Sequence, residues 1–155
     1  KGLISSSVFL DEVSTRFPKA SKEYLTQAWN SILLDFPEER LQFIENLAKE
    51  NQYKMILLSN TNDLHIECVK EQMGIHRFNR FKNAFDKFYL SYEIGMRKPD
   101  SEIFDFVLQE NNLAADETFF VDDVKENTDS ALQLGIKVWN LQVGKEDIAQ
   151  LKSKL

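Results

Sequence analysis

The chain has 155 residues, of which 43% are hydrophobic and 28% charged, and its formal net charge is −6 at pH 7. This composition is typical of a globular domain with a substantial core. The acidic balance argues against general nucleic-acid binding, and no apolar run reaches the roughly 18–20 residues of a membrane span. The single cysteine, Cys68, excludes an internal disulfide and favours a reducing, cytoplasmic compartment.

Residues 1–36 have a helical pattern. Phe9, Val13 and Phe17 recur every four residues, and Ser21 is placed to cap a second helix. Glu38–Glu50 then has the apolar spacing of another amphipathic helix. We expect the first 36 residues to form a helical appendage that is distinct from the rest of the chain.

From residue 54 onward, short apolar runs alternate with helical patterns. Strands are expected at 54–58, 85–89, 118–121 and 136–141, and helices are expected to run to Gly74, from Asp100, to Leu134 and over Lys145–Leu155. Continuous apolar runs that end in polar residues are typical of buried parallel strands. The alternation therefore predicts an α/β fold, a parallel sheet with helices on both faces.

Three polar features lie at or near the ends of these strands: Ser59-Asn60-Thr61, Lys98 and the pair Asp122-Asp123. Each has an ordinary explanation, since polar residues after a strand cap helices, a lysine before proline is usually solvated, and a helix start favours acidic residues. Together they suit metal-assisted phosphoryl chemistry. A hydroxyl and backbone N–H groups can hold a phosphate, a lysine can neutralise its charge, and two carboxylates offer hard oxygens to Mg²⁺.

The motifs resemble those of a known family. Leu57–Thr61, Arg97–Asp100 and Phe120–Asp123 are similar to the second, third and fourth motifs of the haloacid dehalogenase (HAD) superfamily, in the same order. The resemblance is to the subfamily with a helical cap inserted early in a Rossmann-like core, many of whose members are Mg²⁺-dependent phosphatases. It implies a partial helical cap at residues 1–36 and a HAD-like α/β core at residues 37–155.

The resemblance also implies how the phosphate would be bound. Ser59 would hydrogen-bond the transferring phosphoryl group, and the backbone N–H of Asn60 would assist it. Lys98 would stabilise the negative charge on that group and on the nucleophile. Ser59 and Lys98 are thus the catalytic candidates in this sequence.

For the cofactor, the resemblance implies Mg²⁺ organised by Asp122 and Asp123. Asp123 would be the direct ligand, and Asp122 would act largely through water. Asn127, one helical turn further on, would orient the loop that carries both aspartates.

The family's first motif, Asp-x-Asp, does not occur, because no two aspartates of the chain are two positions apart. In the family its first aspartate attacks phosphorus to form an aspartyl-phosphate, and its second acts as general acid and base. The central strand that carries it is not found either. The sequence could be part of a longer protein, another chain could supply the strand, or the sheet could be rebuilt. The first explanation is favoured because the sequence begins at Lys1 without a methionine, and the 155 residues alone are then expected to be inactive.

The leading hypothesis is a HAD-like phosphatase that acts on a small phosphorylated metabolite and binds neither nucleic acid nor membrane. A dehalogenase or phosphonate hydrolase is an alternative, but metal-free dehalogenation has no use for the Asp122-Asp123 pair. A non-catalytic binding or regulatory protein without the nucleophile is the third hypothesis. His65, Cys68 and Trp29 are interpreted as packing residues, and the abundant phenylalanines suit either a core or a homodimer interface.

Overall fold

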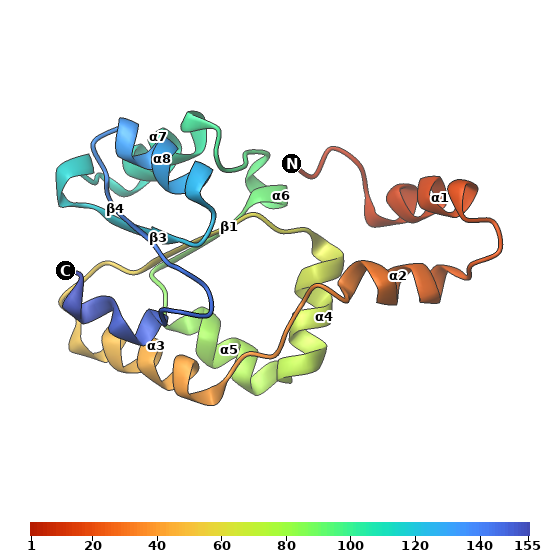
Figure 1. Ribbon diagram of the computed structural model, residues 1–155, viewed down its shortest axis with the longest axis horizontal. Coiled ribbons are helices and arrows are strands. Elements are labelled where there is room, and N and C mark those ends of the chain that lie inside the picture. Colours follow the sequence, from red (N-terminus) through yellow and green to blue (C-terminus); the bar gives the residue numbers. More distant parts are fainter. The chain divides into compact units, whose positions relative to one another are not determined.

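The computed structural model describes residues 1–155, which divide into two compact units, Lys1–Gly95 and Met96–Leu155 (Figure 1). Each unit contains one pair of parallel strands together with several helices. The α/β class and the parallel strand pairing are therefore as the sequence predicts. The strands form two separate two-stranded sheets, β1-β2 and β3-β4, rather than one continuous sheet. The predicted division between residues 36 and 37 stays a prediction.

The first unit begins with helices and then adds a strand pair. In chain order its elements are α1 (Ser6–Arg16), α2 (Lys22–Asn30), α3 (Glu38–Glu50), β1 (Ile56–Ser59), α4 (Asp63–Met73), α5 (Ile75–Asn83), β2 (Lys87–Leu90) and α6 (Ser91–Ile94). Helix α2 is capped by the Ser21 hydroxyl, as predicted, and α3 has the predicted bounds. Ser59, the last residue of β1, pairs with Leu90 of β2.

The buried apolar residues of the first unit are Leu25, Leu41, Leu47, Met73, Phe78, Ala84 and Leu90. Helices α3 and α5 are joined at the surface by Arg80, which binds Glu38 at 2.7 Å and Glu45 at 2.8 Å. Hydrogen bonds from Arg80 lower the pKa of both carboxyl groups below the ordinary value. The phenylalanine-rich segment packs internally, with Phe81 in edge contact with Phe85 and Phe88.

The second unit has the elements α7 (Ser101–Asn111), η1 (Ala115–Glu117), β3 (Phe119–Asp122), α8 (Lys125–Gln133), β4 (Lys137–Asn140) and η2 (Ile148–Ser153). Its buried apolar residues are Ile103, Phe104, Val107, Ala131, Ile136 and Trp139. Strands β3 and β4 pair over their whole length, and Asp122 at the end of β3 is opposite Asn140. The register therefore leaves the Asp122-Asp123 pair at the carboxyl end of this sheet.

The chain end differs from expectation. In place of an amphipathic α-helix over Lys145–Leu155, the structure has the 3-10 helix η2, which begins only at Ile148. The physical reason lies just before it. Glu146 is drawn into a bridge with Val143 and accepts a hydrogen bond from Trp139 Nε1 at 3.1 Å, and Asp147 starts the new helix by capping Ala149.

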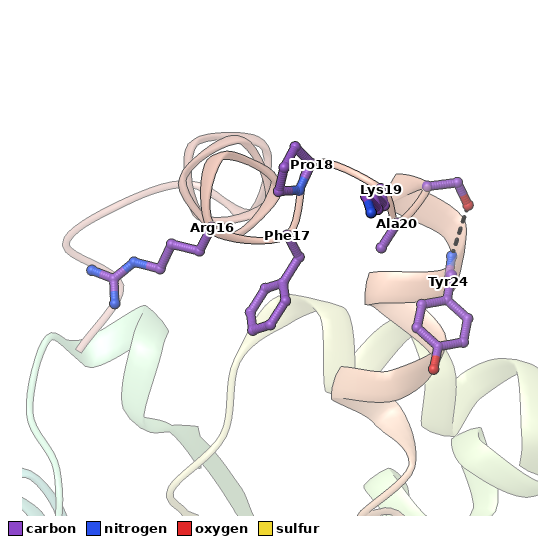
Figure 2. Close-up of a pocket in the computed structure, with 7 residues that line it drawn as sticks. Arg16, Phe17, Pro18, Lys19, Ala20 and Tyr24 are labelled. Atoms are coloured by element: carbon purple, nitrogen blue, oxygen red, sulfur yellow. Dashed lines mark hydrogen bonds between the residues drawn. The ribbon is translucent and has the colours of Figure 1, made fainter.

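An open pocket of about 640 Å³ lies in the first unit, at the turn between α1 and α2. Figure 2 shows the side chains around it, with the rings of Phe17 and Tyr24 on the same side of the turn and the Ser21 cap on Tyr24 N–H as a dashed line. None of the residues predicted to carry the chemistry lines this pocket.

Candidate active site

Lys98 and Asp122 meet in the second unit as a buried ion pair. Lys98 Nζ lies 2.6 Å from Asp122 Oδ2, and the two side chains are only 8% and 7% exposed. The ring of Phe120, with its centroid 5.3 Å from Lys98 Nζ, covers the ammonium group. Lys98 is therefore not a solvated charge. The structure holds it in one place, against the carboxylate that ends β3.

Three donors hold the Asp122 carboxylate. Besides Lys98 on Oδ2, the backbone N–H of Val124 donates to Oδ1 at 2.9 Å, and Asn127 Nδ2 donates to the same oxygen at 3.0 Å. Asn127 lies in the first turn of α8 and is 4% exposed. Because both oxygens of Asp122 are already engaged, this carboxylate is fixed in orientation and has little capacity left for a ligand of its own.

Asp123 has the opposite environment. Asp123 is exposed, and its carboxylate takes part in no hydrogen bond or ion pair of the structure. Its backbone is fixed, since Asn140 Nδ2 donates to the carbonyl oxygens of Asp122 at 3.2 Å and of Asp123 at 3.0 Å. A rigid backbone thus presents a carboxylate that is open to a ligand, beside one that is not.

These oxygens fit Mg²⁺ in kind. Magnesium prefers hard oxygen ligands, usually takes one or two carboxylates from a protein and keeps several waters. The structure has no group of three or more His, Cys, Asp or Glu side chains that could hold a metal ion. The aspartate pair therefore suits an ion whose remaining ligands are water or a bound phosphate rather than a closed protein cage.

Ser59 and Asn60 belong to the first unit, where they end β1 and begin the loop to α4. This loop is held by Ser91, a residue that the sequence motifs did not point to. Ser91, 3% exposed, accepts a hydrogen bond from Thr61 N–H at 3.0 Å and donates one to Thr61 O at 3.0 Å. Asn62 then caps α4 by accepting from the backbone N–H of His65 at 3.0 Å. The loop after β1 thus has a fixed shape at the start of a helix.

A family model described as haloacid dehalogenase-like hydrolase matches residues 6–141 of the chain. The chain belongs to this family. It is 32% identical over 122 residues to a D-ribitol-5-phosphate phosphatase from Bacteroides thetaiotaomicron, an alignment that covers 79% of this chain and 58% of that protein. The chain thus spans less than two thirds of the length of that curated relative.

Solved structures of HAD proteins resemble it over nearly its whole length. A wild-type HAD family enzyme from Bacteroides thetaiotaomicron, in complex with magnesium and inorganic phosphate, aligns with a TM-score of 0.87 and 38% identity, over 97% of this chain and 75% of that one. A predicted HAD-like family hydrolase from Porphyromonas gingivalis aligns with a TM-score of 0.83 and 26% identity, over 99% and 74% of the two chains. The family and the fold expected from the sequence motifs are thus confirmed.

Within the HAD-like chain, the structure brings together four of the six predicted residues. Lys98, Asp122 and Asn127 are joined directly, and Asp123 follows Asp122 in the chain. Ser59 and Asn60 lie in the other unit. No helix of the structure combines the length and the apolar character that a membrane span requires.

Proposed function

We propose that the protein is a Mg²⁺-dependent phosphatase of a small phosphorylated metabolite and works through an aspartyl-phosphate intermediate. The proposal rests on the difference between the two carboxylates at the end of β3. The Asp122 carboxylate is hydrogen-bonded by Lys98, Val124 and Asn127, whereas the Asp123 carboxylate stays open to a ligand. The relatives support it, since one is named as a phosphatase and another was crystallised with magnesium and phosphate.

Each residue has a proposed task. The Ser59 hydroxyl and the Asn60 N–H donate hydrogen bonds to the phosphoryl oxygens, and the Lys98 ammonium balances the negative charge that grows during transfer. Asp123 would hold the metal directly, while Asp122 would orient Lys98 and act on the metal largely through water. Mg²⁺, when bound, would neutralise phosphoryl charge as a Lewis acid.

The 155 residues contain no Asp-x-Asp, so in this proposal the nucleophile is not one of them. We propose that an N-terminal segment carries this motif. Its first aspartate would attack phosphorus and expel the alcohol, and its second would give that alcohol a proton and later activate the water that cleaves the aspartyl-phosphate. The 155 residues alone should then bind ligands but not turn over.

The test measures phosphate release from a panel of sugar, polyol and other small phosphate esters, with and without Mg²⁺. It compares the natural-length protein with the 155-residue chain. Lys98→Ala and Asp123→Ala in the natural-length protein should each lose about 10²-fold or more in rate, the usual effect of removing one charge-stabilising group. Asp105→Ala is the matched control, because Asp105 is an exposed aspartate on α7 of the same unit.

Two results would reject the proposal. One is a natural product whose intact mass and N-terminal sequence show that it begins at Lys1. The other is a natural-length protein that releases no phosphate from any ester with any divalent metal. In that second case, calorimetric binding of Mg²⁺ and phosphate would instead support the non-catalytic alternative.

A further inference from the structure

Helices α1 and α2 are tied to helix α4 of the same unit at its first turn. Ser6, the first residue of α1, hydrogen-bonds Asp63, the first residue of α4. Two residues further along α4, still in its first turn, His65 Nε2 lies 3.3 Å from the backbone oxygen of Trp29 in α2. Figure 1 shows α2 reaching the side of α4. Both ties fall directly after the loop that begins with Ser59.

The second tie is the more specific one. His65 is 8% exposed, and its ring stacks on the indole of Trp29 with centroids 5.6 Å apart and planes inclined by 28°. Phe9 of α1 also contacts the Trp29 indole, with ring centroids 4.6 Å apart. Because a carbonyl oxygen can only accept, His65 Nε2 carries the hydrogen of the bond to Trp29.

The backbone of His65 has a separate role in the same turn. Its N–H donates to Asn62 Oδ1 at 3.0 Å, the bond that caps α4 and ends the loop after β1. One residue therefore closes the loop with its main chain and holds helix α2 with its side chain. A movement of the loop that turned the start of α4 would have to move Trp29 as well, or break the stack.

The geometry points to His65 as a positioning residue that docks the α1-α2 pair on α4 and couples it to ligand binding by the loop from Ser59 to Thr61. The docking part rests on contacts alone. The coupling part rests on the function proposed for the loop. His65 does not touch the phosphoryl group in this scheme. It acts through Trp29 on one side and through the capped helix on the other.

The docking is tested with 5-fluorotryptophan and ¹⁹F NMR of the whole chain, which has two tryptophans and hence two signals. Trp29→Phe assigns them. His65→Ala should shift the Trp29 signal toward that of solvent-exposed tryptophan and leave the Trp139 signal in place. His65→Gln keeps a hydrogen-bond donor at a similar reach, and His65→Phe keeps only an aromatic ring. In each of these variants the Trp29 signal should lie between its positions in wild type and in His65→Ala.

His76→Ala is the matched control, because His76 is the only other histidine and is exposed on α5. It should move neither signal. An unchanged Trp29 signal in all three His65 variants would overturn the docking role. If the Trp139 signal of His65→Ala also moves to the position of an unfolded chain, this variant has unfolded. The Trp29 signals of His65→Gln and His65→Phe then test the docking role.

The coupling is tested with inorganic phosphate and Mg²⁺ as the probe, with binding followed separately by calorimetry. In the wild-type chain, phosphate should shift the Trp29 signal with the same saturation curve as the heat of binding. In His65→Ala the heat should remain and the Trp29 response should be lost. An equal response in both proteins would overturn the coupling. A wild-type chain that binds no phosphate would contradict the proposed function of the loop and, with it, the coupling, while the docking result would stand.

Discussion

Asn127 offers a direct test of how the Asp122 carboxylate is held. Asn127→Ala removes a buried hydrogen bond of 3.0 Å to a charged acceptor. Hydrogen bonds to charged groups contribute about 1.5–3 kcal/mol, so this variant should lose about that much stability. Glu126→Ala, an exposed change in the same helix turn, should stay within about 0.5 kcal/mol of the wild type.

Asn127→Asp should behave differently, because it places a second carboxyl group about 3.0 Å from Asp122. At an effective dielectric constant of 20, two unit charges at this distance repel by about 5.5 kcal/mol. The new group would instead take up a proton, which at pH 7 costs about 4 kcal/mol for an ordinary aspartate pKa of about 3.9. Once protonated, it can donate to Asp122 in place of the asparagine amide. The expected loss at pH 7 is therefore about 4 kcal/mol.

The sign of the pH dependence follows from this proton. The folded state raises the pKa of the introduced carboxyl group. The stability deficit of Asn127→Asp relative to wild type should therefore be smallest below about pH 4 and should grow as the pH rises. Urea unfolding followed by Trp139 fluorescence, with Trp29→Phe as the common background, measures it in the second unit. An Asn127→Asp deficit at pH 7 no larger than that of Asn127→Ala, or one that does not shrink toward pH 4, would refute the reasoning.

Three further predictions concern packing and one tyrosine with a raised pKa. Ile103→Ala should cost about 2–5 kcal/mol in urea unfolding and Ile103→Val about 0.5–1.5 kcal/mol, because this side chain is 0% exposed. Gly2→Ala should make the N-terminal segment more accessible to proteases, because the new Cβ would lie 2.2 Å from the Tyr92 backbone oxygen. Gly74→Ala is the control, because Gly74 has a similar φ and its Cβ would have no atom within 4 Å. Burial, followed by nearby acidic groups, raises the pKa of Tyr92 to about 12. Ultraviolet titration should show a late ionisation that Tyr92→Phe removes, and its contribution to stability should be present below about pH 10 and lost as pH rises through about 12.

Local patterns predicted the elements whose causes are local. The Glu38–Glu50 helix has its apolar spacing, a preceding proline and an acidic first turn within a few residues, so the sequence contains every determinant of its bounds. The Ser21 cap is similarly local. Strand ends were less accurate. The expected strand at 54–58 begins instead at Ile56, because Asp86, which lies 31 residues further on, binds the backbone N–H of Met55 with its side chain.

The candidate site shows the same limit. The residue types at Lys98, Asp122 and Asn127 could be identified from motifs, but their joining in one buried network could not, since Lys98 and Asp122 are 24 positions apart. Ser91 carried no signal, because a single serine after a strand has many uses and its bonds to Thr61 depend on the fold. The same holds for His65, whose partner in α2 precedes it by 36 residues.

The unequal surroundings of Asp122 and Asp123 also affect how variant data on this protein should be read. Asp122 is a structural hub with three donors, whereas Asp123 extends into solvent from a backbone that Asn140 holds. A variant with alanine at both positions would lose the hydrogen bonds to Asp122 as well as the open carboxylate of Asp123. Its inactivity would not show which of the two losses was the cause. In a screen that measures both protein abundance and turnover, substitutions of Asp122 should lower both quantities together. Substitutions of Asp123 should lower turnover alone. Two chemically identical neighbours would thus fall into different classes of phenotype.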